Sequence, residues 1–253
     1  NAKRPSTAIP DNVSLITDVV YAEYGDRKLL MDIATPVGGD RQRPCVVVVH
    51  GGGWLNGDKT KFRALSLALA SRGYVTAAID YRLGYEAKFP AGIHDCNAAV
   101  RFLRANSASL GIDPNRIGAV GGSAGGHLVG LMATGWQDAG LQGEGGNSDQ
   151  SSRLQAAIVM AGPMEMTTGS VAERSRKEAS KSNSNVWLGK TFDEAPELYA
   201  LADAKLHIDE KSTPILFMVG EHDLPARNEP SREALRAAGV WTDPTDSTNQ
   251  TCG

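Results

Sequence analysis

The chain has 253 residues, of which 41% are hydrophobic, and its 26 basic and 29 acidic side chains leave a formal net charge of -3. This composition suits a globular protein with an ordinary core, so we expect residues 1–253 to form a single domain. The interspersed charges form no basic stripe for nucleic acid, and no apolar run approaches the roughly 18 residues of a membrane span. A small, largely neutral partner molecule is favoured.

Strands alternate with helices along the first half of the chain. Residues 15–35 alternate apolar and polar side chains around a Gly-Asp turn, which predicts a β-hairpin. The apolar, β-branched stretch "PCVVVVH" at 44–50 predicts a strand buried on both faces. Asp58 is expected to cap the next helix, and "YVTAAID" at 74–80 to form the next strand. The apolar face expected for that helix consists of Phe62, Leu65 and Leu69, with Gly73 at its end.

The alternation continues in the second half. We expect a helix near 92–106, a strand over "RIGAVGG" at 116–122 and a helix after Ser123. Further strands are predicted over 154–162 and 213–220, followed by a helix over 229–239. This order predicts an α/β fold, with a mostly parallel sheet covered by helices on both faces.

Three segments and the cysteines depart from this pattern. Residues 137–152 have the composition of a flexible loop, and residues 162–196 form a long insertion, a candidate lid or pocket wall. Residues 241–253 have the composition of a disordered or irregular polar tail. The cysteines have neither the even number of a disulfide framework nor the spacing of a metal site, and we interpret Cys45 and Cys96 as buried apolar residues.

Ser123 lies in "GGSAG" at 121–125, which satisfies G-x-S-x-G between a predicted strand and a predicted helix. A sharp strand-to-helix turn strains the serine backbone and brings neighbouring backbone close, so that only glycine fits two residues to either side. The start of the following helix offers free N–H groups and partial positive charge. The motif predicts that Ser123 is a nucleophile.

A second glycine loop, "HGGGW" at 50–54, follows the buried strand directly. Its bare backbone can point N–H groups into a cavity, and with the N–H of Ala124 these donors would form an oxyanion hole. The alternative is a pair of phosphate-binding loops. That alternative is disfavoured because neither loop has G-K-[ST] or G-x-G-x-x-G.

Together these motifs resemble the α/β-hydrolase superfamily, and within it the esterase and lipase group, hormone-sensitive-lipase-like or feruloyl-esterase-like. The resemblance runs from about residue 16 to 240 and includes "FPAGIHDCNAAVRFLR" and "PILFMVGEHD". It implies hydrolysis of small or short-chain carboxylic esters, with no metal or organic cofactor. Ser123 would attack the ester, the N–H groups of Gly52, Gly53 and Ala124 would bind the oxyanion, and Asp223 would be the acid of the triad. By the same resemblance, the substrate pocket draws on Trp54, Met164, Met166, Trp187 and Leu188.

The histidine of the triad is the unresolved part of this prediction, because the sequence contains no histidine after Asp223. We interpret His50, His94 and His127 as structural, and nothing ties His207 to the site. His222 adjoins Asp223, but neighbouring residues on a strand point to opposite faces, which disfavours a hydrogen bond between them. Asp223 itself has the alternative of a turn aspartate.

Several explanations of this gap stay open. The sequence is compatible with an altered or truncated C-terminus, with a histidine donated by a partner chain, or with a hydrolase-fold protein that binds a small acyl ligand without turning it over. A peptidase or a carbohydrate esterase on the same scaffold is a further alternative. The strand at 213–220 would be left at the sheet edge, and we expect a second copy of the chain or the tail itself to cover it.

Overall fold

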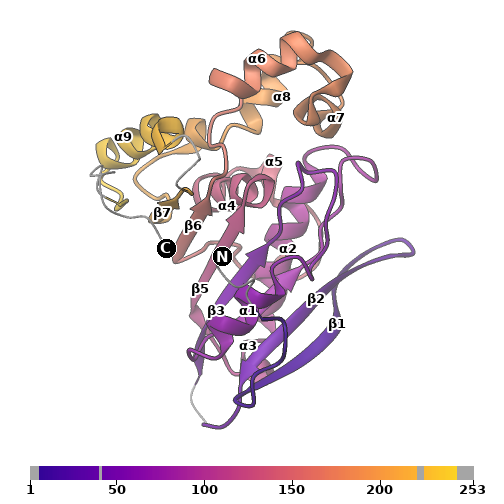
Figure 1. Ribbon diagram of the computed structural model, residues 1–253, viewed down its shortest axis with the longest axis vertical. Helices are drawn as coiled ribbons and strands as arrows, with labels where there is room; N and C mark the ends of the chain where they lie inside the picture. Colours follow the sequence, from indigo (N-terminus) through magenta and orange to yellow (C-terminus); the bar gives the residue numbers. More distant parts are fainter. Residues whose placement is uncertain (1–5, 40–41, 221–224, 244–253) are drawn as a thin grey trace.

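The computed structural model describes residues 6–39, 42–220 and 225–243 (Figure 1). Its sheet has seven strands in the order β1-β2-β4-β3-β5-β6-β7. The first two pairings in this order are antiparallel and all the others are parallel, which confirms the predicted α/β class. The strands are β1 (Val13–Tyr24), β2 (Arg27–Pro36), β3 (Arg43–Val49), β4 (Val75–Ile79), β5 (Ile112–Gly122), β6 (Ala156–Met160) and β7 (Ile215–Met218).

Helices cover both faces of the sheet. α1 packs on the face that carries Val48 and Val120, whereas α2 and α4 pack on the face that carries Val47 and Val49. The predicted apolar face of α1 is confirmed, because Phe62, Leu65 and Leu69 lie against Val48 and its neighbours. Among the described residues, the α-helices outside the insertion are α1 (Arg63–Ala70), α2 (Ala91–Ala105), α3 (Ser107–Leu110), α4 (Ala124–Thr134), α5 (Ala139–Gln142) and α9 (Glu229–Ala237).

The β1–β2 hairpin is confirmed, and so are the buried strands β3 and β4. The expected capping role of Asp58 is wrong. α1 begins at Arg63, and the Asp58 carboxylate accepts a hydrogen bond from the backbone N–H of Thr60 at 2.7 Å. Aspartate readily forms such a turn with the residue two positions ahead, which delays the start of the helix.

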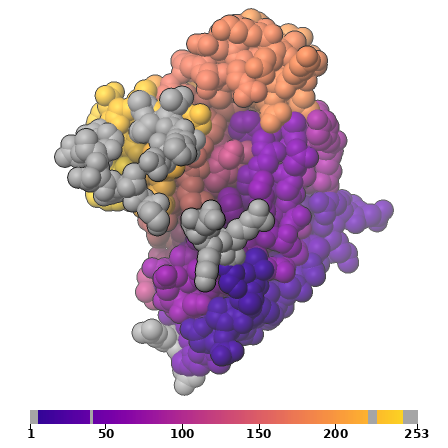
Figure 2. All heavy atoms as spheres, viewed as in Figure 1, coloured from indigo at the N-terminus to yellow at the C-terminus, as the bar shows by residue number. Residues whose placement is uncertain are grey.

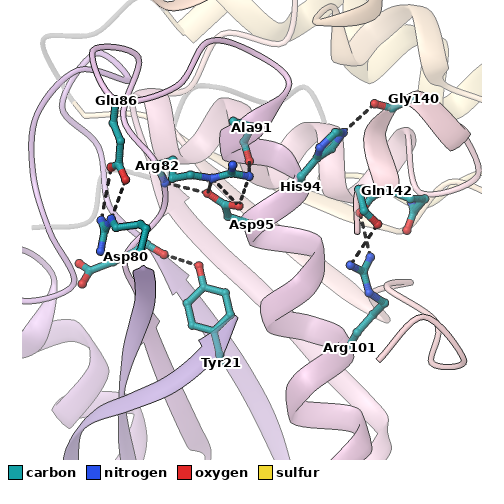
Figure 3. A network of polar contacts seen from close by, with 12 residues as sticks. Tyr21, Asp80, Arg82, Glu86, Ala91, His94, Asp95, Arg101, Gly140 and Gln142 are labelled. Atoms are coloured by element: carbon teal, nitrogen blue, oxygen red, sulfur yellow. Dashed lines mark hydrogen bonds and ion pairs between the residues drawn. The ribbon is translucent and has the colours of Figure 1, made fainter. Parts of the chain in front are cut away.

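The segment 137–152 is not the free loop that its composition suggested. It contains α5, and the buried Arg101 side chain donates to the backbone carbonyls of Gln142, Gly143 and Gly146 at 2.9–3.4 Å (Figure 3). Arg104 donates to the carbonyls of Ser151 and Arg153 in the same way. The arginines of α2 therefore hold the segment in place, because they satisfy carbonyls that it leaves unpaired.

The insertion between β6 and β7 forms a layer of short helices above the carboxyl edge of the sheet (Figures 1 and 2). Its α-helices are α6 (Gly169–Glu178), α7 (Asn183–Leu188) and α8 (Pro196–Leu201). α7 is attached to the core, since Phe89 N–H donates to the carbonyl of Trp187 at 3.0 Å and Lys88 Nζ to that of Val186 at 2.7 Å. These contacts place α7 as a wall over the edge of the sheet.

β7 lies at the end of the sheet, and the start of the predicted polar tail covers part of it. Ile215 N–H donates to the carbonyl of Trp241 at 3.3 Å, and Phe217 N–H to Asp243 Oδ1 at 3.1 Å. Arg232 pairs with the same carboxylate at 3.1 Å. Residues 241–243 therefore occupy two donors of this strand, which agrees with the expectation that the tail itself covers it. Among the described residues, no helix is long and apolar enough to cross a membrane.

Candidate active site

Parallel pairing brings the two glycine motifs to one edge of the sheet. β3 and β5 are neighbours in register, with Val49 opposite Gly121, so the loop after β3 and the turn after β5 begin side by side. β6 and β7 follow on the same side, with Val159 and Phe217 in the corresponding positions. Ligand sites of α/β proteins form at this carboxyl edge of the strands.

Ser123 forms the turn between β5 and α4 in a strained conformation. Its backbone has φ 54° and ψ −121°, and its side chain is exposed. The Ser123 N–H donates to the carbonyl of Met160 at 2.8 Å, and its carbonyl accepts from His127 N–H at 3.0 Å in the first turn of α4. Non-glycine residues keep such a backbone only where their surroundings enforce it, as at functional sites.

The glycines around Ser123 are required by close backbone contacts. A Cβ at Gly121 would lie 2.3 Å from the carbonyl oxygen of Gly125. A Cβ at Gly125 would lie 2.2 Å from the carbonyl oxygen of Val49. Both separations are shorter than any real contact of a Cβ, so these positions accept only glycine.

The loop after β3 lies directly against this turn. A Cβ at Gly51 would lie 2.5 Å from the carbonyl oxygen of Gly122 and 3.2 Å from the Cβ of Ser123. The next two residues have the left-handed φ values of 141° at Gly52 and 61° at Gly53. Such values favour glycine and allow a tight loop beside the serine.

Hydrogen bonds fix the direction of the peptide groups in this loop. Lys61 Nζ donates to the carbonyl of Gly51 at 3.1 Å, and the carbonyl of Gly52 accepts from Leu55 and Asn56 N–H at 3.2 and 3.1 Å. In a trans peptide the C=O and the next N–H point in opposite directions, so the N–H groups of Gly52 and Gly53 are turned away from these partners.

The three N–H groups predicted to form the oxyanion hole belong to Gly52, Gly53 and Ala124. None of them donates to an acceptor within the part of the chain that the structure describes. Backbone donors that are left unpaired beside a serine can bind a negatively charged oxygen. Lys61, which helps to orient them, carries no motif by which the sequence could have identified it.

The aromatic and apolar residues expected to line the pocket mostly form core. Trp54 stacks on Trp187 with ring centroids 5.0 Å apart, and both are buried, as are Met166 and Leu188. Met164 is buried in the same core. It also borders a hollow of about 330 Å³ beside the loop after β6, together with Pro163, Glu165, Thr168, Gly169, Ser170, Val171 and Arg227.

A larger hollow, of about 660 Å³, lies away from these residues. It is bordered by the loop after β4, the start of α2 and the segment around α5, with Tyr24, Arg82 and His94 among its lining residues. Figure 3 shows part of it, with Arg82 against Asp95 and His94 pointing to Gly140. It contains none of the predicted site residues, so its size alone does not connect it with Ser123.

His127 is buried in the core beneath the loop after β3. Burial lowers the pKa of His127 from 6.5 to about 4, so the ring is neutral at pH 7. Its Nε2–H donates to the carbonyl of Ala202 at 2.7 Å, and its Nδ1 accepts from Trp54 Nε1 at 3.2 Å. Both ring nitrogens therefore form hydrogen bonds within the core, which agrees with the prediction that His127 is structural.

The other described histidines are also held by structural contacts. His50 is buried and stacks on Tyr81 with centroids 4.4 Å apart, and burial lowers the pKa of His50. His94 contacts the carbonyl of Gly140 at 2.8 Å, and His207 that of Leu201 at 2.9 Å. Within the described ranges, no histidine forms a hydrogen bond with Ser123.

Asp223 and His222 lie outside the described residues. The last described strand before them is β7, which ends at Met218 on the same edge of the sheet as Ser123. The role of Asp223 therefore stays a prediction from the resemblance. Among the residues that can be described, no cluster of His, Cys, Asp or Glu could hold a metal ion.

Comparison with known proteins connects this architecture with esterases. The sequence profile of the BD-FAE family matches residues 31–236. Esterase LipQ of Mycobacterium tuberculosis is 28% identical over 232 residues, which are 89% of this chain and 54% of LipQ. Esterase LipC of the same organism is 30% identical over 198 residues, which are 77% of this chain and 48% of LipC. The chain thus spans about half the length of these two relatives.

A solved structure shares the fold over nearly the whole chain. The truncated form of a carbohydrate esterase from gut microbiota superposes with a TM-score of 0.78 at 23% identity, covering 92% of this chain and 87% of the other. At this identity the likeness is one of fold. It agrees with the sheet order and the helices on both faces described above.

Proposed function

The chain belongs to the BD-FAE family of α/β-hydrolase esterases, and we propose from this that it hydrolyses small or short-chain carboxylic esters through an acyl-enzyme on Ser123. The observation that carries the proposal is the pairing of an exposed, strained serine with unpaired N–H groups of Gly52, Gly53 and Ala124. A site of this kind favours acyl transfer, because the donors stabilise the charge that appears on the carbonyl oxygen.

The reaction follows from this geometry in two steps. Ser123 Oγ adds to the ester carbonyl carbon, the π electrons move to the carbonyl oxygen, and the N–H groups of the two loops bind the resulting anion. The intermediate collapses, the C–O bond to the alcohol breaks, and the alcohol leaves with the proton that Ser123 gave up. Water then adds to the acyl-enzyme through the same oxyanion, and the acid leaves as Ser123 regains its proton.

The carrier of that proton decides how fast both steps run. The four described histidines form no hydrogen bond with Ser123, so we propose that the proton passes to a histidine supplied in trans, with Asp223 orienting its ring, or to His222. Loss of the triad histidine in a serine hydrolase lowers kcat by about 10⁶, and oxyanion hole and binding retain about 10³ to 10⁴ over water. We therefore propose an impaired esterase that acylates faster than it turns over.

The hollow beside Met164 supports a small acyl group. Its volume is about 330 Å³, and it adjoins the loop that follows β6. The last residue of β6, Met160, accepts the N–H of Ser123 through its carbonyl. The α7 wall is fixed to the core by Trp187 and Lys88, which limits the length of substrate above the site. We propose acetyl to butyryl esters as the preferred class.

A second candidate function is binding of a small acyl ligand without turnover. The observation that favours it is the engagement of all four described histidines in structural contacts. The two candidates differ in one requirement, since only catalysis needs a reactive Ser123.

The test is a time course of p-nitrophenyl butyrate hydrolysis at enzyme concentrations that reveal a single turnover. We expect a burst of about one equivalent followed by slow release, and loss of both phases in Ser123→Ala. Ser14→Ala is the matched control, because Ser14 is exposed on β1, far from the carboxyl edge. His222→Ala then tests the base. Absence of any Ser123-dependent product would contradict the proposal and favour the binding function.

We also propose that a second copy of the chain packs beside β7, because β7 is the last strand of the sheet among the described residues. The two outward-facing donors of β7, Ile215 N–H and Phe217 N–H, already have acceptors on Trp241 and Asp243, so the copy would pack over this cover. Sedimentation equilibrium should then show a dimer. A monomer at all concentrations would contradict this packing.

A further inference from the structure

We propose that Asn183, the first residue of α7, is a catalytic residue that donates a hydrogen bond from its side-chain amide to the oxyanion of the substrate. The inference deepens the function proposed above and rests on it. It assigns a role to a residue of the insertion that no motif of the sequence marks.

The Asn183 side chain lies directly over the glycine loop. A Cβ at Gly53 would lie 2.2 Å from Asn183 Nδ2 and 3.1 Å from its Cγ, so the amide occupies the place that a side chain at position 53 would need. Asn183 is exposed, and within the described residues its amide forms no hydrogen bond. It is thus a free polar group beside one of the proposed oxyanion donors.

The distance suits a shared acceptor. A Cβ lies about 2.5 Å from the nitrogen of its own residue, which places Asn183 Nδ2 within about 5 Å of the backbone nitrogen of Gly53. Two N–H···O hydrogen bonds of about 2.9 Å span up to about 6 Å. A single oxygen atom can therefore accept from Gly53 and from Asn183 at the same time.

The position of Asn183 is fixed by the rest of α7. Trp187, one turn later, stacks on Trp54, and its carbonyl accepts from Phe89 N–H at 3.0 Å. The Asn185 amide donates to the carbonyls of Ser175 and Ala179 at 2.9 and 2.6 Å. These contacts hold the backbone of α7, and with it the Cα of Asn183, in place before the reaction. A donor whose position is set in advance stabilises developing charge with little reorganisation.

The chemistry of the amide agrees with this role. An asparagine Nδ2 offers two N–H donors, so it can bind an anionic oxygen. An aspartate of the same shape would place negative charge beside the developing oxyanion. A leucine of similar size would preserve packing and remove the donor.

The experiment compares Asn183→Ala, Asn183→Leu and Asn183→Asp with the unchanged chain in the burst assay with p-nitrophenyl butyrate. Removal of one oxyanion donor lowers kcat by about 10² to 10³, so we expect a fall of the acylation rate constant by about 10² in the first two variants. The fall should be larger in Asn183→Asp, with the KM changed by less than about threefold in all three. Asn115→Ala is the matched control, since Asn115 is an exposed asparagine near the opposite end of β5.

A second readout does not depend on turnover. In Ser123→Ala protein, binding of butyrate is measured by titration calorimetry, with and without Asn183→Ala, because a carboxylate oxygen can occupy the same donors. We expect affinity to fall at least fivefold when Asn183 is replaced. Unchanged acylation in Asn183→Leu together with unchanged butyrate affinity overturns the inference. A third outcome separates the two proposals. If the unchanged chain shows no turnover but Asn183→Ala still weakens butyrate binding in the Ser123→Ala protein, the proposed function is overturned and the role of Asn183 as a donor is supported.

Discussion

The two glycine loops around Ser123 and the insertion between β6 and β7 meet at the same edge of the sheet, but different interactions fix them. In the loops, the backbone approaches itself so closely that a Cβ at Gly52 would lie 1.8 Å from the carbonyl oxygen of Asn56. In the insertion, side chains carry the contacts, as in the stack of Trp187 on Trp54. The glycine loops thus depend on the absence of side chains, whereas the insertion depends on large ones.

His127 joins the two regions. It comes from α4 behind Ser123, accepts from the indole of Trp54 in the loop, and donates to the carbonyl of Ala202 in the insertion. Trp54 itself has a positive φ of 62°, which a large side chain adopts only where packing enforces it. The insertion and α4 thus support the loop conformation from outside the motif.

The largest expected effect is on the glycine loop. In Gly52→Ala, a Cβ would meet a backbone carbonyl at 1.8 Å, and φ 141° is strained for alanine. The free energy of unfolding should fall by about 5 kcal/mol, from strain and overpacking together. Denaturant unfolding measures this, with Gly146→Ala as control, because Gly146 also has a positive φ but open space around it. Equal losses in the two variants would show that the close contact is unimportant.

The next effect is on the insertion. Trp187 is fully buried between Trp54 and Phe89, so Trp187→Ala should lower the free energy of unfolding by about 4 kcal/mol. It should also slow acylation, because the loop after β3 loses its support. Trp241→Ala makes the same chemical change at a side chain that is 59% exposed, and should alter stability by less than about 0.5 kcal/mol. If both variants behave alike, the insertion does not stabilise the core.

The smallest effect is expected at His127, which connects the glycine loop after β3 with the insertion. Because the pKa of His127 is lowered from 6.5 to about 4, the unfolded chain binds a proton in this range that the folded chain does not. The contribution of neutral His127 to the free energy of unfolding is therefore complete above pH 6.5. It decreases by about 3 kcal/mol as the pH falls towards 4. The free energy of unfolding of the unchanged chain and of His127→Gln is measured from pH 7 to 4. Contributions of the carboxylates are common to both proteins and cancel in the difference between them. Parallel curves would contradict a neutral buried His127.

Some sequence predictions failed for identifiable reasons. The prediction that Asp58 caps α1 is wrong, because Asp58 forms a turn with Thr60. The segment 137–152 was interpreted from its composition, which does not reveal that Arg101 satisfies its carbonyls from a helix about 40 residues earlier. Trp187 and Met166 are predicted to line the pocket, but both are buried in the core. The local sequence of an insertion does not reveal which of its sides packs against the sheet.

The alternation of strands and helices, the parallel sheet and the two glycine loops can be predicted from the amino-acid sequence alone. These depend on local constraints, namely side-chain periodicity and the space that a Cβ needs at Gly121, Gly125 and Gly52. Three other features are visible only in the folded chain: His127 is held neutral, residues 241–243 cover part of β7, and Asn183 lies over Gly53. Each of these depends on residues far apart in the chain, whose contacts and shared burial arise when the whole domain packs.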